Sequence, residues 1–192
     1  MELERVTKQP ATGARLFDRP IQNLQDALAT VTYLDHIFGR AERLVKEVNG
    51  RRLYTPNIYI GKGDYVSLTP DDYDLGNYCF FVREEPEQMG ASMGLQSRVH
   101  APFSLIVWVD MRKVSDSDDR NVYQFERDIL DAICRPGALK KGGMKVTNVW
   151  HTAEKVFDGF SLDEVDNQYL MSPFCGIRIG LELWIDEDCT NQ

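Results

Sequence analysis

The sequence predicts a single α+β domain, with a mixed, mostly antiparallel sheet packed by a long N-terminal helix and a second helix. Apolar residues recur every three or four positions across 21–49, which is the spacing of an amphipathic helix. Residues 174–186 alternate between apolar and polar, which is typical of a strand with one buried face. The order of elements lacks a regular alternation of strand and helix, so a doubly wound nucleotide-binding fold is not expected.

The chain of 192 residues has the usual length of one domain. Residues 1–20 hold few periodic apolar positions and are interrupted by prolines and a glycine, which predicts a flexible N-terminal arm. We expect the domain to span 21–188, followed by a polar C-terminal tail over 189–192.

The long helix is predicted from both its stripe and its ends. Pro20 suits a first helical turn, and Asn49-Gly50 can supply the left-handed residues that end a helix. The stripe consists of Leu24, Ala27, Leu28, Val31, Leu34, Phe38, Ala41, Leu44, Val45 and Val48.

A β-rich stretch is expected after the helix. Residues 57–60, 65–68 and 77–83 are short runs of aromatic and β-branched residues, which favour strands. Pro56 before the first run indicates a sheet edge or a bulge. Residues 84–100 are long and aperiodic, and loops of that length are often functional or disordered.

The second half of the chain supplies the centre of the predicted sheet. Residues 103–114 are apolar on both faces in their first half, so this strand is expected to be central. A second helix is predicted over 119–135, ended by Pro136-Gly137. Residues 145–157 resemble an irregular strand, and 174–186 form the closing strand.

Charge restricts the classes of partner. The net charge is −8, which argues against DNA or an anionic membrane as the main partner. Up to Arg52 the chain holds 9 Lys and Arg against 7 Asp and Glu (+2), and the remainder holds 13 against 23 (−10).

Motifs for chemistry are missing from the sequence. We predict no catalytic residues, no cofactor and no metal ligands. We interpret the acidic segment 71–74 as a solvated turn, and binding of a divalent ion there stays open as the alternative. The histidines have no sequence partner that would activate them. Trp184 lies on the polar face of its strand, which makes it a candidate interface anchor unless a second layer covers that face.

The order of these segments resembles a known family. The central strand PFSLIVWVDMRKV, the helix NVYQFERDILDAI and the closing YLMSPFCGIRIGLELWI, after a long amphipathic helix and hairpins, are similar to the tail terminator and tail completion proteins of tailed phages and prophages. The resemblance covers roughly 21–188 and rests on hydrophobic patterns.

The resemblance implies a structural virion protein, not an enzyme, at the neck of the tail and assembled in the host cytoplasm. Such proteins form a homohexameric ring that caps the tail tube and joins it to the head–neck connector, while DNA passes through the lumen without specific binding. Residues 61–76 and 84–100 would then be assembly segments. The candidate interface residues are Arg83, Glu84, Met89, Met93 and Trp184.

Two other functions stay open at this point. One is a cytosolic binding or adaptor domain without catalysis. The other is an enzyme whose site is assembled from distant residues, for which His100, His151 and the carboxylates of 71–74 are the available groups.

Overall fold

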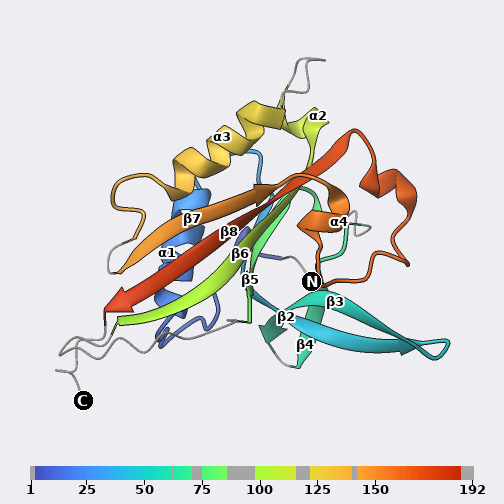
Figure 1. Ribbon diagram of the computed structural model, residues 1–192, viewed down its shortest axis with the longest axis horizontal. Helices are drawn as coiled ribbons and strands as arrows, with labels where there is room; N and C mark the ends of the chain where they lie inside the picture. The colour runs from blue at the N-terminus through green and yellow to red at the C-terminus, as the bar shows by residue number, and fades with distance from the viewer. Residues whose placement is uncertain are drawn as a thin grey trace.

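One large mixed sheet dominates the protein (Figure 1). The computed structural model describes residues 3–61, 63–70, 75–85, 98–115, 122–139 and 142–186. Within these ranges eight strands form one sheet in the order β4-β3-β2-β5-β6-β8-β7, with β1 pairing beside β2. The strands are β1 (Val6–Thr7), β2 (His36–Val48), β3 (Arg51–Gly61), β4 (Asp64–Ser67), β5 (Tyr78–Arg83), β6 (Arg98–Asp110), β7 (Gly143–Trp150) and β8 (Phe174–Asp186).

The helices are short. The longest helix in the described part of the chain has 12 residues. The helices are α1 (Asp18–Leu28), α2 (Met111–Val114), α3 (Val122–Ile133), α4 (Ala153–Val156) and the 3₁₀ helix η2 (Asn167–Leu170). The predicted fold class is therefore wrong, because no long N-terminal helix packs on the sheet.

The error lies in residues 21–49. Helix α1 ends at Leu28, and residues 36–48 are strand β2. The pairing of β2 with β5 shifts register between Ile37 and Arg40, so the buried positions Ile37, Phe38 and Ala41 do not follow a period of two. This bulge gives Phe38 and Ala41 the spacing of a helix, whereas Leu44, Val45 and Val48 of the predicted stripe lie beyond it, where β2 is mostly exposed. Asn49-Gly50 ends no helix but forms the turn between β2 and β3.

Helices α1 and α3 lie together against one face of the sheet (Figure 1). Leu24 and Leu28 of α1 and Phe125 and Ile129 of α3 are fully buried in the core on that face. Strands β6 and β8 are the centre of this core, and their thirteen-residue antiparallel pairing runs from Arg98↔Asp186 to Asp110↔Phe174.

The opposite face carries a second, smaller core. Val156 and Phe157, at the end of α4, are buried against it, and the Phe157 ring packs edge-on against Trp108 at 5.3 Å. The α4 segment therefore covers only part of this face.

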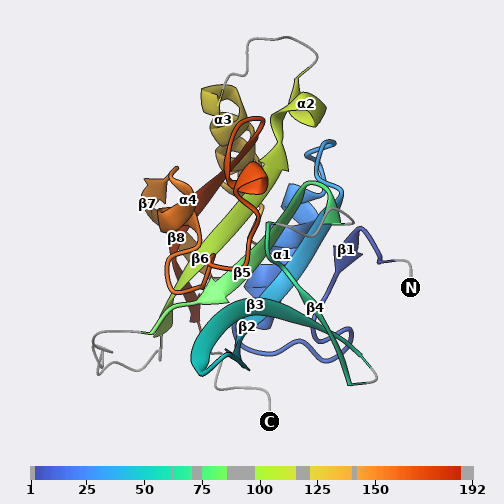
Figure 2. The same cartoon turned by 90° about the vertical axis from the view of Figure 1, so that its right-hand side faces the viewer.

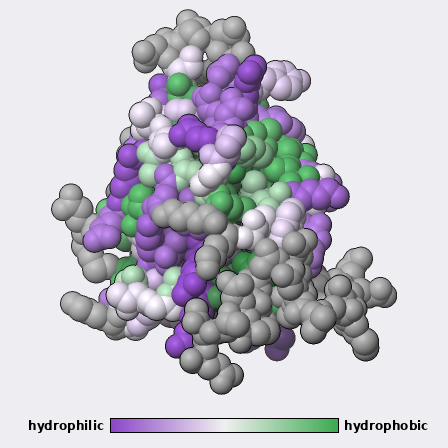
Figure 3. Space-filling view, turned by 90° about the vertical axis from the view of Figure 1, so that its left-hand side faces the viewer, coloured by the Kyte–Doolittle hydropathy of each residue, from purple (hydrophilic) through white to green (hydrophobic). Residues whose placement is uncertain are grey.

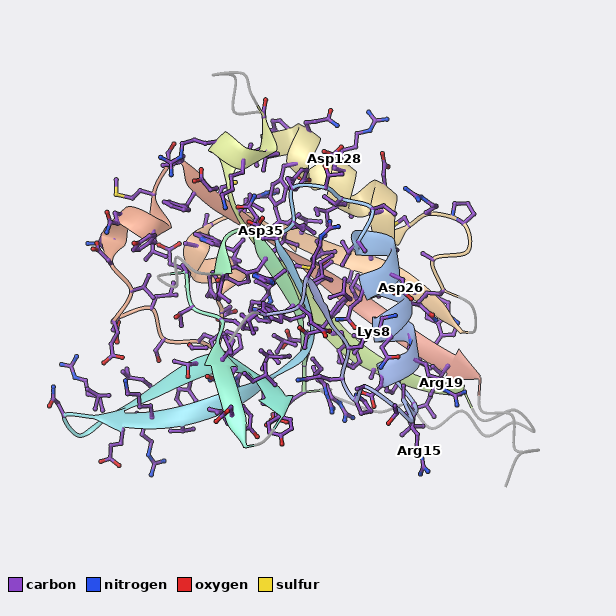
Figure 4. The ribbon with its side chains drawn as sticks, turned by 180° about the vertical axis from the view of Figure 1, so that it is seen from behind. Lys8, Arg15, Arg19, Asp26, Asp35 and Asp128 are labelled. Atoms are coloured by element: carbon purple, nitrogen blue, oxygen red, sulfur yellow. The ribbon has the colours of Figure 1, made fainter. Side chains whose placement is uncertain are left out.

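The N-terminal segment contacts the sheet and α1. Val6 and Thr7 pair in parallel with Ile37 and Phe38 of β2. The amide of the buried Gln25 of α1 donates to the carbonyl oxygens of Thr7 (2.9 Å) and Ile37 (3.1 Å). Lys8 forms an ion pair at 2.6 Å with Asp26, which like Gln25 belongs to α1 (Figure 4).

Candidate functional site

The most distinctive surface feature is a two-stranded hairpin that extends from the sheet to the right in Figure 1 and points toward the viewer in Figure 2. Strand β2 pairs with β5 up to Ala41, and β3 pairs with β4 from Asn57 onward. Residues 42–57 pair with each other, and among them only Asn57 also pairs with a further strand of the described chain, through Ser67 of β4. We call residues 42–57 the hairpin.

The turn of the hairpin follows from two residues. Asn49 and Gly50 both adopt positive φ, at 51° and 74°. Two successive left-handed residues make a type I′ turn, whose twist matches that of the paired strands, and Asn-Gly is its preferred sequence. The hairpin register, which pairs Val48 with Arg51, is fixed by this turn.

One face of the hairpin presents apolar side chains to solvent. Val45 and Tyr54 lie directly opposite each other in the register, so their side chains share a face. Val45 is 56% exposed and Tyr54 is 38% exposed. On the same face, the next pair toward the turn is Glu47 and Arg52, so charged residues border the apolar pair Val45 and Tyr54.

A second exposed aromatic pair lies beside the hairpin. Tyr59 of β3 opposes Tyr65 of β4, with ring centroids 5.2 Å apart, and both side chains are more than 40% exposed. Tyr59 lies five positions after Tyr54, an odd number, so the two exposed pairs lie on opposite faces of β3.

The base of the hairpin is held by residues 153–166, which we call the strap. Ser161 pairs with the outer edge of β3, donating its N–H to the Tyr54 carbonyl (2.8 Å) and accepting from the Tyr54 N–H through Oγ (3.0 Å). The Arg43 guanidinium stacks over the Phe160 ring at 5.4 Å. Lys46 and Glu164 form an exposed ion pair at 3.7 Å.

The strap is in turn anchored by a buried arginine of β8. The Arg178 guanidinium donates to Ser104 Oγ (3.0 Å), the Asp158 carbonyl (2.8 Å) and Glu84 Oε1 (2.5 Å). It also reaches the Lys155 carbonyl near the end of α4. Arg178 is 7% exposed, so these partners satisfy a charge that would otherwise be costly to bury.

An open groove of about 650 Å³ lies between the N-terminal segment and the start of the hairpin. Charged side chains of both signs line it, including Lys8, Arg40, Asp18 and Glu42. Because the charges are mixed, the groove selects no class of small ligand.

The predicted interface residues do not form one surface. Arg83 pairs in register with Phe103 and faces the α1 side of the sheet, whereas Trp184 pairs with His100 on the opposite face. Glu84 is engaged by the buried Arg178. Met89 and Met93 lie outside the described residues, as do most of 84–100, the acidic segment 71–74 and the tail 189–192.

Trp184 is partly exposed. Its indole lies against Gly143, where an added Cβ would come within 2.2 Å of the ring, and it stacks on His100 at 6.0 Å. Figure 3 shows the molecule from the side of α3 and the β7–β8 pair, where apolar residues gather in the middle and polar residues border them. Strand β7 ends the sheet here, and its outer edge is unpaired in the described chain.

The histidines considered for an assembled active site do not meet. His100 binds Glu182 at 3.2 Å, beside the start of β7, whereas His151 lies 3.5 Å from Glu126, just after the end of β7. Both histidines are about half exposed. Among the described residues no group of three or more His, Cys, Asp or Glu could hold a metal ion.

Asp110 and Arg112 form an ion pair at the start of α2. The Asp110 carboxylate caps α2 by accepting from the Arg112 N–H (3.0 Å), and it also binds the Arg112 guanidinium. Hydrogen bonding from Arg112 lowers the pKa of Asp110. Burial, together with Asp110, raises the pKa of the nearby Cys175 thiol to about 11, so this thiol is protonated at neutral pH.

Sequence reasoning missed the hairpin and the residues that position it. The Asn-Gly pair was the available signal, because it is also the strongest short-range indication of a hairpin. Arg178 alternates with the apolar residues of the predicted strand 174–186, on the same face as Trp184, but its burial depends on Glu84 and Asp158, which are distant in sequence.

Comparison with protein-family models and with curated proteins gives no match. No helix in the described ranges has the length and apolar character needed to cross a membrane.

Proposed function

We propose that this chain is a structural subunit of a phage or prophage tail, which assembles into a ring of the tail terminator type. The ring caps the tail tube and joins it to the head–neck connector, so the protein is located in the virion. The observation that carries the proposal is the hairpin, which extends from the sheet and presents Val45 and Tyr54 to solvent.

The exposed residues have the composition of a protein interface. Tyrosine and arginine are enriched at interfaces and among the residues that contribute most to binding energy. The hairpin and its neighbouring strand offer Tyr54, Tyr59 and Tyr65 with Arg51 and Arg52. A monomer gains little stability from these exposed side chains, whereas an assembly would bury them.

The surfaces also suit a ring. The hairpin and the strap are different elements of the chain and do not resemble each other. A contact between unlike patches is heterologous, and it closes into a ring when the rotation between copies permits. The central strand β6, the helix α3 and the closing strand β8 are the part of the resemblance to the tail terminator family that supports assigning the ring to the tail, whereas the long helix expected over 21–49 gives no such support.

The test is the mass of the full chain in solution, measured by light scattering after size exclusion over a range of concentration and salt, with negative-stain images of the main peak. We expect a ring of about six subunits. A monomer at every concentration that also fails to bind the open end of purified phage tail tubes would contradict the proposal.

A further inference from the structure

The hairpin and the strap carry opposite charge. The hairpin holds four basic residues against two acidic ones, a net charge of +2, in a chain whose total is −8. The strap holds five acidic residues against Lys155, a net charge of −4. Its acidic residues Glu154, Asp158, Asp163, Glu164 and Asp166 are all exposed.

The two surfaces neutralise each other only in part within one chain. Lys46 pairs with Glu164 at the base of the hairpin. Arg51 and Arg52 lie at the far end, beyond the point where Ser161 pairs with Tyr54, and neither has an ion pair in the described part of the molecule. Asp158 and Asp163 of the strap likewise have exposed carboxylates without a described ion pair.

From this arrangement we propose that the hairpin of one copy docks on the strap of a second copy, with the arginine end of the hairpin against the carboxylates of Asp158 and Asp163. Arg52 shares the face of Val45 and Tyr54, whereas Arg51 borders the contact from the other face of the strand, beside the turn. This proposal rests on the proposed function, since it names the contact that would build the assembly. The apolar pair Val45 and Tyr54 lies between the base and the charged end, so it is buried at the centre of the contact while the ion pairs form the rim.

The occupant is a second copy because charge complementarity is present on this chain itself. Opposite potentials accelerate association and select the partner. A nucleic acid would also attract the hairpin, but it would be repelled by the remainder of the chain, whose net charge is −10. It would also leave Val45 and Tyr54 without an apolar partner.

The experiment uses two charge-reversed variants of the full chain, R51E/R52E and D158R/D163R. In R51E/R52E the hairpin (net charge −2) and the strap (−4) have the same sign. In D158R/D163R the strap loses its net charge, from −4 to 0, and the two new arginines would face Arg51 and Arg52 of the next copy. Each variant alone should therefore self-associate at least about tenfold more weakly than the wild-type chain. An equimolar mixture should recover assembly, since the glutamates introduced in the hairpin of one variant would face the arginines introduced in the strap of the other. The readouts are the mass by light scattering and the melting temperature of each variant.

A matched control reverses two charges elsewhere. Arg15 lies near the start of α1, at the other end of the molecule from the hairpin (Figure 4), and Arg135 follows α3. Both are exposed, and R15E/R135E changes the net charge as R51E/R52E does. The control should assemble as the wild-type chain does.

Three outcomes would contradict the docking. The first is a mixture that fails to recover assembly although both variants melt normally, and the second is a control that dissociates as strongly as R51E/R52E. The third is salt-sensitive binding of a DNA duplex that R51E/R52E abolishes while the mass of the protein stays unchanged. Recovery as a closed pair of copies would support the docking and contradict the ring, so the two proposals can fail separately.

Discussion

The centre of the sheet and the hairpin are built from the same kind of strand pairing but differ in what covers them. Strands β6 and β8 are covered by α1 and α3 on one face, and by α4 on part of the other. Leu105 of β6 and Ile179 of β8 are fully buried. In the hairpin the equivalent cross-strand pair, Val45 and Tyr54, is exposed. The centre therefore provides the stability of the fold, and the hairpin is available for contact with another molecule.

The largest expected effect comes from placing a charge in the centre. Leu105→Asp buries a carboxylate among Phe81, Ile179 and other apolar side chains, at a cost of several kcal/mol, about enough to unfold a marginally stable domain. Val45→Asp makes the same kind of change in the hairpin and should cost less than about 0.5 kcal/mol. Chemical denaturation of both variants measures the difference, and equal losses would show that the hairpin is part of the folding core.

Removing Arg178 should have the next largest effect. Arg178→Met leaves the Glu84 carboxylate and the Asp158 carbonyl without their buried donor, which should cost about 3 kcal/mol. Because Arg178 anchors the strap, and the strap holds the base of the hairpin, hydrogen exchange should also accelerate at Tyr54. Arg83→Met, on an exposed residue of β5, is the control and should be close to neutral. Unchanged hydrogen exchange at Tyr54 would contradict the proposed connection from Arg178 through the strap to the hairpin.

A smaller effect is expected at the α2 cap. Asp110→Asn weakens the interaction with Arg112 and should cost about 1 kcal/mol near neutral pH. The folded pKa of Asp110 is lowered, so its stabilising contribution is present above its ordinary pKa and is lost as the pH falls through the folded pKa. The wild-type chain and the variant should therefore converge in stability at acidic pH, as thermal melts from pH 7 down to pH 2 would reveal. A constant difference across that range would contradict the assignment.

The smallest effect on stability is expected in the hairpin. The double substitution Val45→Ser and Tyr54→Ser removes apolar surface that is already largely exposed, so the melting temperature should change little. The same substitution should reduce self-association strongly, because it removes the apolar centre of the proposed contact. A variant that assembles normally would show that this face of the hairpin is not an interface.

Much of the sheet could be predicted because its signals are local. The alternation in 174–186 gave β8 with its observed bounds, and the stripe of Phe125, Ile129, Ala132 and Ile133 gave α3 within the predicted 119–135. The prediction for 21–49 failed in part because a bulge in β2 puts the buried residues Phe38 and Ala41 at a spacing that a helix also produces. Asn49-Gly50 was the local signal for a hairpin, but the same pair also suits the end of a helix.

Less of the candidate site than of the fold could be predicted from the sequence. Trp184 was correctly placed on the polar face of β8, and its partial exposure depends on how far α4 extends over that face. The hairpin could not be recognised once its residues were assigned to a helix. The role of Arg178 required knowing that β5, β6 and the strap converge on β8.

Hydrogen–deuterium exchange of the full wild-type chain, followed at low and high protein concentration, tests most directly whether the hairpin is an assembly arm on a separately stable core. We expect the amides of residues 44–53 to exchange rapidly in dilute protein and to become protected as the concentration rises, while those of β6 and β8 stay protected throughout. Protection of the hairpin that equals that of β6 in dilute protein, or that does not change when the protein associates, would contradict this division of roles.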